Sequence, residues 1–234
     1  MKLYKYRPIN EHIDSIFTDK KIWFPKRSIL NDPEDLLLAV ENDVTAEIYK
    51  EYLLGRSKRE HWSRKILRQN LRRAFSKNRL SDAGRKKIQQ ALKKSKGFID
   101  NLGILSLSED GDNRNLWERY AGNEKGICLE FELTPSNLLL KVVYAESRPE
   151  LKLSQLIMGE NPEEMIMNVL RTKTMKWSDE KEWRCFLKKG NANFSFLQIG
   201  NLTGVKFGRM SSQKDKDRVM SLIISSGNSL KIGS

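Results

Sequence analysis

Short runs of alternating apolar and polar residues predict a protein with many short strands. In the first run, Leu3, Lys5 and Arg7 fall on one side of the predicted strand, and Tyr4 and Tyr6 fall on the other. Similar runs predict further strands at residues 21–25, 103–108, 126–133, 139–144, 182–187, 194–199, 204–207 and, weakly, 230–232.

Other segments have the spacing of helices. Candidate helices cover residues 11–19, 115–122, 162–175 and 213–227. A turn is predicted at residues 31–35, because Asp32 precedes Pro33 and is pushed out of helical geometry. A helix with Pro33 in its first turn is the alternative. The mixture of short strands and helices predicts an α+β core.

Residues 43–97 have an entirely helical pattern. Apolar residues recur there at helical spacing, at Trp62, Ile66, Leu67, Leu71, Phe75, Ile88 and Leu92. The pattern breaks at residues 78–84, Ser81 is a suitable N-cap for a second helix, and Gly97 is a suitable C-terminal stop. We therefore expect a helical hairpin at residues 43–97, inserted into a core domain formed by residues 1–42 and 98–234.

Positive charge is concentrated in the same segment. The chain carries a net +13, yet residues 43–96 alone hold 17 Lys and Arg against five Asp and Glu, a net +12. The candidate phosphate-binding residues there are Arg64, Lys65, Arg68, Arg72, Arg73, Lys86 and Lys87. This density predicts a surface for nucleic acid or another polyanion. A solvated face that keeps the protein soluble is the alternative.

Composition narrows the function classes. Two cysteines, Cys128 and Cys185, cannot form a disulfide framework, and two histidines cannot form a His-rich metal site. No stretch of about 18 apolar residues predicts a membrane span, and the charged first residues do not resemble a signal peptide. We expect a cytoplasmic protein that needs no metal and has no membrane partner.

Two carboxylates lie two residues apart at the entrance of a predicted strand. If the strand begins there, Glu180, Glu182 and Arg184 share one face. Such a carboxylate pair can orient a hydroxyl, stabilise a developing cation, or act as acid and base. A surface salt bridge between Glu182 and Arg184 is the alternative.

Other residues have both a binding interpretation and a structural one. Arg7 can hold a phosphate through two hydrogen bonds, or lie at the surface at a strand end. Ser106 and Ser108 point to one side of their strand, toward a ligand or toward water. Trp117 and Tyr120 are three apart on a predicted helix, where they either pack in the core or stack on a ligand.

Several of these segments, in this order, resemble a bacterial and phage family, domain of unknown function number 2971. The matching segments are residues 3–7, 22–24, 31–33, 103–109, 115–121, 125–128, 176–184 and 206–208. The resemblance covers most of the chain outside the basic segment. It implies no activity by itself; a toxin or phage-defence role would suit the family, but no residue of this sequence indicates it.

A weaker resemblance implies an activity. The order of Arg7, the strand Ser106-Leu107-Ser108 and the Glu-x-Glu of Glu180 and Glu182 is similar to the Arg–Ser–Glu pattern of ADP-ribosyltransferases. The usual threonine between the two serines is absent here. The resemblance implies a split, mixed or antiparallel sheet of that type and NAD as substrate.

In that class the arginine holds the dinucleotide phosphates and the serine strand shapes the nicotinamide pocket. The second glutamate stabilises the oxocarbenium-like ribose. These roles fall on Arg7, Ser108 and Glu182, with Glu180 assisting the choice of acceptor. Ser106 and the aromatic residues Tyr6, Trp117 and Tyr120 complete the implied NAD site, and the acceptor is a macromolecule, with nucleic acid as one candidate.

Two other classes of function remain open on the sequence. A metal-dependent nuclease would use scattered acidic residues and a lysine, namely Asp32, Asp35, Asp179, Glu180 and Lys181. A non-catalytic binding module would use only the basic segment, and its binding would weaken steeply with salt.

Overall fold

The computed structural model describes the whole chain except residues 38, 78, 135–138, 160–161, 228 and 234. The described chain divides into two compact units. Unit 1 contains residues 1–35, 101–146 and 173–234, and unit 2 contains residues 36–100 and 147–172. Unit 2 thus includes the basic segment 43–97 together with a later stretch of the chain.

Unit 1 is an α+β unit built on a mixed sheet. Over the described residues this sheet has seven strands in the order β15-β14-β7-β1-β6-β12-β8. Its strands are β1 (Lys2–Arg7), β6 (Gly103–Ser108), β7 (Ile127–Leu133), β8 (Leu139–Lys141), β12 (Glu182–Leu187), β14 (Gly200–Phe207) and β15 (Lys231–Gly233). Neighbouring strands are antiparallel except β14 and β15, which are parallel.

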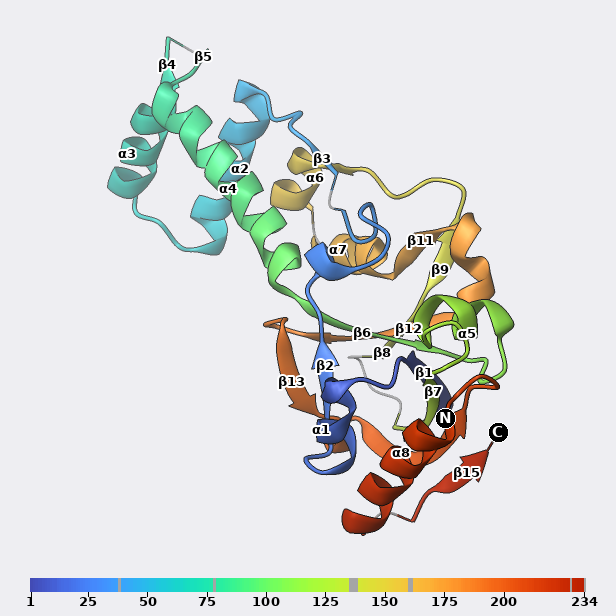
Figure 1. Cartoon of the computed structure of the whole chain (residues 1–234). Helices are drawn as coiled ribbons and strands as arrows, with labels where there is room; N and C mark the ends of the chain where they lie inside the picture. Colours follow the sequence, from blue (N-terminus) through green and yellow to red (C-terminus); the bar gives the residue numbers. More distant parts are fainter. Residues whose placement is uncertain (38, 78, 135–138, 160–161, 228, 234) are drawn as a thin grey trace. The chain divides into compact units, whose positions relative to one another are not determined.

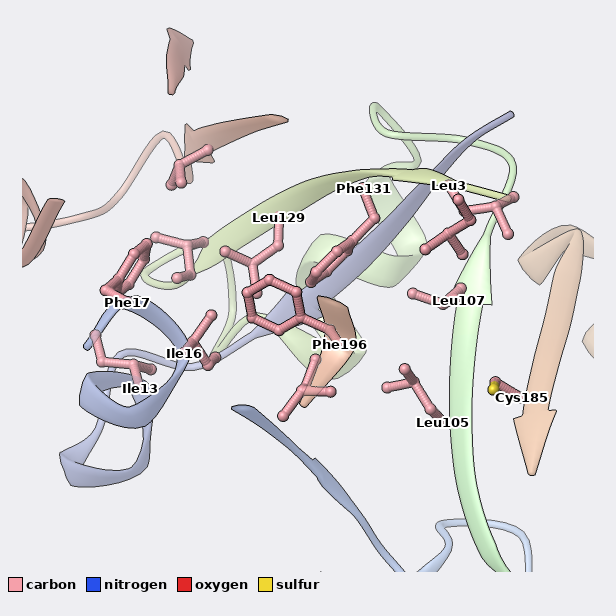
Figure 2. Packing of buried hydrophobic residues seen from close by; sticks show 14 of the residues in the cluster. Leu3, Ile13, Ile16, Phe17, Leu105, Leu107, Leu129, Phe131, Cys185 and Phe196 are labelled. Carbon is pink, nitrogen blue, oxygen red and sulfur yellow. The ribbon is translucent and has the colours of Figure 1, made fainter. Parts of the chain in front are cut away.

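The main core lies on one face of this sheet. Helices α1 (Asp14–Phe17) and α8 (Gln213–Ser225) cover that face (Figure 1). Figure 2 shows Ile16 and Phe17 of α1 beside Leu129 and Phe131 of β7. Phe196 packs against the ring of Phe131, with ring centroids 5.3 Å apart.

The opposite face carries helix α5 (Arg114–Tyr120). A second, smaller cluster forms there, in which Leu116 of α5 is buried with Tyr6 and Cys128. Asn113 caps this helix by accepting from Leu116 N. Alternation in β6 and β12 therefore sends leucines and Cys185 to the main core, whereas Ser106, Ser108, Glu182 and Arg184 face the side of α5.

The sheet opens between two of its central strands. β1 pairs with β7 along its whole length, from Lys2 opposite Glu132 to Arg7 opposite Ile127. With β6, in contrast, the described pairing is limited to Tyr4 opposite Ser108. Beyond that pair the two strands diverge, and the backbone groups of the opening are available to side chains and ligands.

Unit 1 also contains shorter elements. They are 3-10 helix η1 (Glu11–Ile13), β2 (Lys21–Phe24), 3-10 helix η2 (Arg27–Ile29), β9 (Val143–Ala145), β11 (Thr172–Thr174), 3-10 helix η3 (Met175–Glu180), β13 (Ala192–Ser195) and 3-10 helix η4 (Phe196–Gln198). β2 pairs with β13. The predicted strand at 194–199 is therefore wrong after residue 195, because Phe196 turns inward and is buried.

Unit 2 is largely helical. Its elements are β3 (Val40–Glu41), α2 (Ala46–Arg59), α3 (Arg64–Ala74), β4 (Phe75–Ser76), β5 (Arg79–Leu80), α4 (Asp82–Asn101), β10 (Leu151–Lys152), α6 (Leu153–Met158) and α7 (Pro162–Arg171). Its core contains Tyr49 and Leu53 of α2, Ile88 of α4 and Leu153 of α6. Strands β3 and β10 pair in parallel.

The predicted helical hairpin is wrong in three details. Helix α2 precedes the two expected helices, and Thr45 caps it by accepting from Ile48 N. Ser81 does accept from Gly84 N as the predicted N-cap of α4, but Gly97 does not end that helix, since the buried Ile99 extends its apolar face. Ile66, expected in the apolar stripe, is 45% exposed. Residue 78 of the predicted break lies outside the described residues.

Other boundaries also differ from the sequence-based expectation. The helix expected at 162–175 ends at Arg171, and the strand expected at 139–144 is two strands separated at Val142. The turn at residues 31–35 is confirmed, with Asp35 N donating to Asp32 O over 3.0 Å, and no helix begins there in the described chain. None of the described helices has both the length and the apolar character that a membrane crossing requires.

Candidate functional site

A cavity occupies the opening between β1 and β6 in unit 1. It has a cavity volume of about 210 Å³ and is open to solvent at its mouth. The backbone turn at residues 31–35, helix α5 and the 3-10 helix η3 supply the other walls. Its polar and aromatic lining includes Lys5, Tyr6, Asp32, Asp35, Ser106, Ser108, Tyr120, Lys173, Trp177, Glu180 and Glu182.

Glu180 and Glu182 reach this cavity by different local structures. Glu180 ends the 3-10 helix η3, Lys181 adopts a left-handed conformation with φ of 44°, and Glu182 begins β12. The predicted strand alternation is therefore wrong for Glu180. Both carboxylates nevertheless meet the same ammonium group, since Lys173 Nζ lies 2.6 Å from Glu180 Oε2 and 2.9 Å from Glu182 Oε2.

Arg184 holds the other side of this cluster. Its Nε donates to Glu182 Oε1 over 2.8 Å, and its Nη2 donates to Asp35 Oδ2 over 2.7 Å. Arg184 is 0% exposed and Glu182 is 2% exposed. The ion pair is thus buried, and the interpretation as a surface salt bridge is wrong. Asp35 Oδ1 is buried without a hydrogen-bond partner among the described residues.

The buried charges shift one another's protonation. Burial alone would raise the pKa of Glu182, but the charges of Arg184 and Lys173 outweigh burial and hold it at about 2. Burial lowers the pKa of Lys173, but the charges of Glu182, Glu180 and Asp35 raise it by more than burial lowers it. The pKa of Lys173 is therefore above its ordinary value. Glu182 is therefore an anion and Lys173 a cation at neutral pH.

The carboxylates of the cluster differ in how many hydrogen bonds their oxygens accept. Both Glu182 oxygens accept from cations, and a hydrogen bond from Ser106 further lowers the pKa of this group. Glu180 Oε1 accepts from Tyr120 OH over 2.7 Å, and Oε2 accepts from Lys173. Because a carboxylate offers about four acceptor positions, Glu182 is nearly saturated, whereas Glu180 retains free lone pairs.

Hydroxyl groups fix the geometry around the carboxylates. Ser108 Oγ donates to Glu180 O over 2.7 Å, and Glu182 N donates to Tyr144 OH over 2.8 Å. Burial and the neighbouring Glu180 charge raise the pKa of Tyr120, so its phenol stays a hydrogen-bond donor. Ser108 is buried, which excludes its alternative position facing water.

Lys5 stands at the opening itself. Its Nζ donates to Ser106 O over 2.8 Å, so it reaches across the gap from β1 to the backbone of β6. Burial lowers the pKa of Lys5 to about 8, with the charge of Arg7 lowering it further and those of Glu182 and Glu180 opposing the change. Lys5 is therefore a cation that loses its charge just above neutral pH.

The structure brings together most of the predicted NAD-site residues. Tyr6, Ser106, Ser108 and Tyr120 line the cavity with the two glutamates. Arg7 does not line it; this residue is half-buried at the end of β1, and burial lowers the pKa of its guanidinium.

Trp117 also lies outside this lining. Its ring meets Tyr6 edge-on, with centroids 5.2 Å apart, which is the packing interpretation of this residue. The predicted phosphate-binding cations from Arg64 to Lys87 lie in unit 2.

Sequence reasoning missed several residues of the site. Lys173 fell inside a predicted helix, where a lysine has no distinguishing pattern, and Lys5 was placed on the same side of its strand as Leu3 and Arg7 without a role. Asp35 was considered only as a nuclease ligand. Trp177, whose Nε1 donates to Asp32 Oδ2 over 2.9 Å, was part of the family resemblance without a role. Trp177 lies three positions before Glu180 in the sequence, and this proximity could have indicated that it belongs to the same site.

The residues of the nuclease hypothesis come together only in part: Asp32, Asp35 and Glu180 line the cavity, whereas Asp179 and Lys181 do not. Asp179 pairs with Arg119 over 3.1 Å, and Lys181 pairs with Asp110 over 3.2 Å. Asp35 and Glu180 instead contact Arg184 and Lys173. Among the described residues, no group of three or more His, Cys, Asp or Glu side chains is placed to hold a metal ion.

Comparison with known proteins gives one match. The model of a family described as "Protein of unknown function (DUF2971)" matches residues 116–185. This segment includes Tyr120, Lys173, Glu180, Glu182 and Arg184, and supports the expected family over that part of the chain. No curated protein and no solved structure matches this chain.

Proposed function

We propose that the cavity of unit 1 binds NAD and that the protein transfers ADP-ribose from NAD to a macromolecular acceptor. The observation that carries the proposal is the wall formed by Glu180 and Asp35. Both carboxylates line the cavity, and Glu180 retains free acceptor positions. The same cavity has the indole of Trp177 and the ring of Tyr120 as aromatic walls.

The chemistry needs a carboxylate rather than a strong acid. Cleavage breaks the bond between the ribose C1′ and the nicotinamide nitrogen, and the electron pair leaves with nicotinamide, which departs neutral. The ribose then carries cationic, oxocarbenium-like character, which a fixed carboxylate in a cavity stabilises. A hydroxyl or amine of the acceptor forms the new bond at C1′ and releases one proton.

We propose different roles for the two glutamates, on the basis of their contacts in the buried cluster. Glu182 is held by Arg184, Lys173 and Ser106, so it positions the cluster and keeps Lys173 charged. Glu180 is the carboxylate with capacity left for the ribose or the acceptor. This assignment departs from the role that the resemblance gives to Glu182, and it makes Glu180 the catalytic residue.

The phosphates of NAD require cations at the mouth of the cavity. Lys5 lines the opening, and Arg7 follows two residues later on the same strand. The Arg7 guanidinium is half-buried and forms no ion pair among the described residues. We assign the diphosphate to Lys5, which lines the cavity; Arg7 does not line it and is proposed only as a contact for a phosphate that extends beyond the lining.

The test is NAD turnover in EDTA. Protein would be incubated with NAD labelled in nicotinamide or in adenine, with RNA, DNA or a protein lysate as acceptor. Two results together would support the proposal: nicotinamide is released, and the adenine label is transferred to one of the acceptors. Glu180→Gln is expected to lower release by about 10²-fold, as for other preorganised electrostatic groups.

Glu132→Gln is the matched control, since Glu132 is an exposed glutamate of β7. If Glu180→Gln fails to fold, Tyr120→Phe tests the same carboxylate by removing one hydrogen bond while keeping the ring. Absence of NAD binding and of nicotinamide release by the folded wild-type protein would overturn the proposal. Cleavage of the RNA or DNA acceptor that occurs only when Mg²⁺ replaces EDTA would favour the nuclease hypothesis.

A further inference from the structure

The second unit has a dense set of exposed cations that its fold does not use. From His61 to Asp100 the chain has 13 Lys and Arg against two Asp. All of these cations are exposed. Arg85 pairs with Asp82, and within the described residues no other cation of this stretch has an ion-pair partner.

The apolar faces of the helices point away from these cations. Leu71 and Ala74 of α3 and Ile88 and Leu92 of α4 pack in the core of unit 2. The exposed cations of α3 are Arg64, Lys65, Arg68, Arg72 and Arg73, and those of α4 include Lys86, Lys87, Lys93 and Lys94. We call these nine residues the basic surface. Their side chains contribute no packing to the core described above.

The arrangement of charge opposes helix stability in the free protein. Arg64, Arg68 and Arg72 are spaced four apart on α3, and like charges at this spacing repel one another. Arg64 and Lys65 also stand in the first turn of α3, which has no acidic residue, although cations are unfavourable at a helix N-terminus. A surface made only for solubility gains nothing from this placement.

We propose that the basic surface binds nucleic acid through its phosphodiester backbone. Regularly spaced, unpaired Arg and Lys side chains neutralise phosphates and release their counterions on binding. Helix α3 contains no aromatic residue, and α4 contains Phe98 alone, so stacking on bases is not supplied. The surface therefore recognises the backbone without reading sequence. This proposal is independent of NAD chemistry in unit 1.

The experiment measures binding of full-length protein to fluorescent 20-mers of unrelated sequences by anisotropy, as double-stranded DNA, double-stranded RNA and single-stranded RNA. We expect affinity to be similar between sequences of one type. It should fall with salt in a log–log plot with slope of about −0.9 for each phosphate neutralised on duplex DNA. The comparison of the three probes identifies the preferred type.

Two variants assign the binding to the basic surface. Arg64→Gln/Arg68→Gln/Arg72→Gln keeps good helix formers on α3 and should weaken binding at least tenfold at 0.1 M salt. It should also reduce the magnitude of the salt slope by about 2 to 3. Lys86→Gln/Lys87→Gln/Lys93→Gln tests α4 separately if the first variant loses helicity by circular dichroism.

The control is Lys188→Gln/Lys189→Gln/Lys214→Gln, which removes three exposed cations from unit 1. It should bind like the wild-type protein. Equal weakening in this control and in the variants, or no binding to any probe at 50 mM salt, would overturn the proposal. Tighter binding to vesicles containing anionic lipid than to every nucleic acid would also overturn it, in favour of a membrane surface.

Discussion

Arg184 and Asp35 form a buried ion pair between residues that are 149 positions apart in the chain. Arg184 Nη2 lies 2.7 Å from Asp35 Oδ2, and the side chains are 0% and 5% exposed. The pair joins strand β12 to the turn after β2, and both residues belong to unit 1. It therefore fixes Asp35 in the wall of the cavity.

Removing Arg184 should be strongly destabilising. Arg184→Met leaves Glu182 and Asp35 buried with too little positive charge, and breaking one partner of such a cluster costs about 3–5 kcal/mol. Arg218→Met is the control, since Arg218 is 39% exposed in its pair with Asp14 and is expected to cost less than about 1 kcal/mol. Urea unfolding of both variants provides the measurement, and equal losses would contradict the buried network.

Glu182 should make the protein sensitive to acid. Its pKa is about 2 in the folded protein and about 4.3 in an unfolded chain. The unfolded state therefore binds more protons between these values, and stability falls as the pH drops from about 5 toward 2. In Glu182→Gln the free energy of unfolding should depend less on pH in this window, whereas Glu132→Gln should keep the wild-type slope.

Lys5 should produce a second window, at alkaline pH, in which stability also rises with pH. Its pKa is lowered to about 8 in the fold, from the ordinary value of 10.5. The unfolded state thus retains a proton that the folded state has lost between these values, so stability rises with pH from about 8 to 10. Lys5→Met should abolish this rise. Unfolding at pH 7.5, 9 and 10 tests it, and an unchanged rise in the variant would show that another group titrates there.

Two glycines of helix α4 should respond oppositely to alanine. A Cβ at Gly97 meets no atom within 4 Å, and Gly→Ala inside a helix typically stabilises by about 0.5–1 kcal/mol. A Cβ at Gly84 would lie 2.4 Å from Ala74 O, a backbone atom that cannot move away freely. Gly84→Ala should therefore lower the melting temperature, while Gly97→Ala raises it. The same direction of change in both would contradict this helix packing.

Local sequence patterns were sufficient to predict an element where one of its faces is buried. The strand at 103–108 and the strand at 182–187 have the predicted bounds, because leucines and Cys185 alternate with polar residues over the main core. The predicted N-cap at Ser81 is confirmed for the same kind of local reason, a single side chain bonding to its own helix. Gly97 misled the prediction, since packing of Ile99 outweighs the low helix propensity of one glycine.

The amino-acid sequence by itself determined the strands with one buried face, the mixed α+β character, and the concentration of charge between residues 43 and 97. These properties depend on residues close together in the chain. Only the tertiary structure decided that Glu180, Glu182 and Lys173 meet, that Arg184 is buried, and that Asp35 completes their cluster. Such contacts depend on sheet register and on a turn far away in sequence. No periodicity along the chain records them.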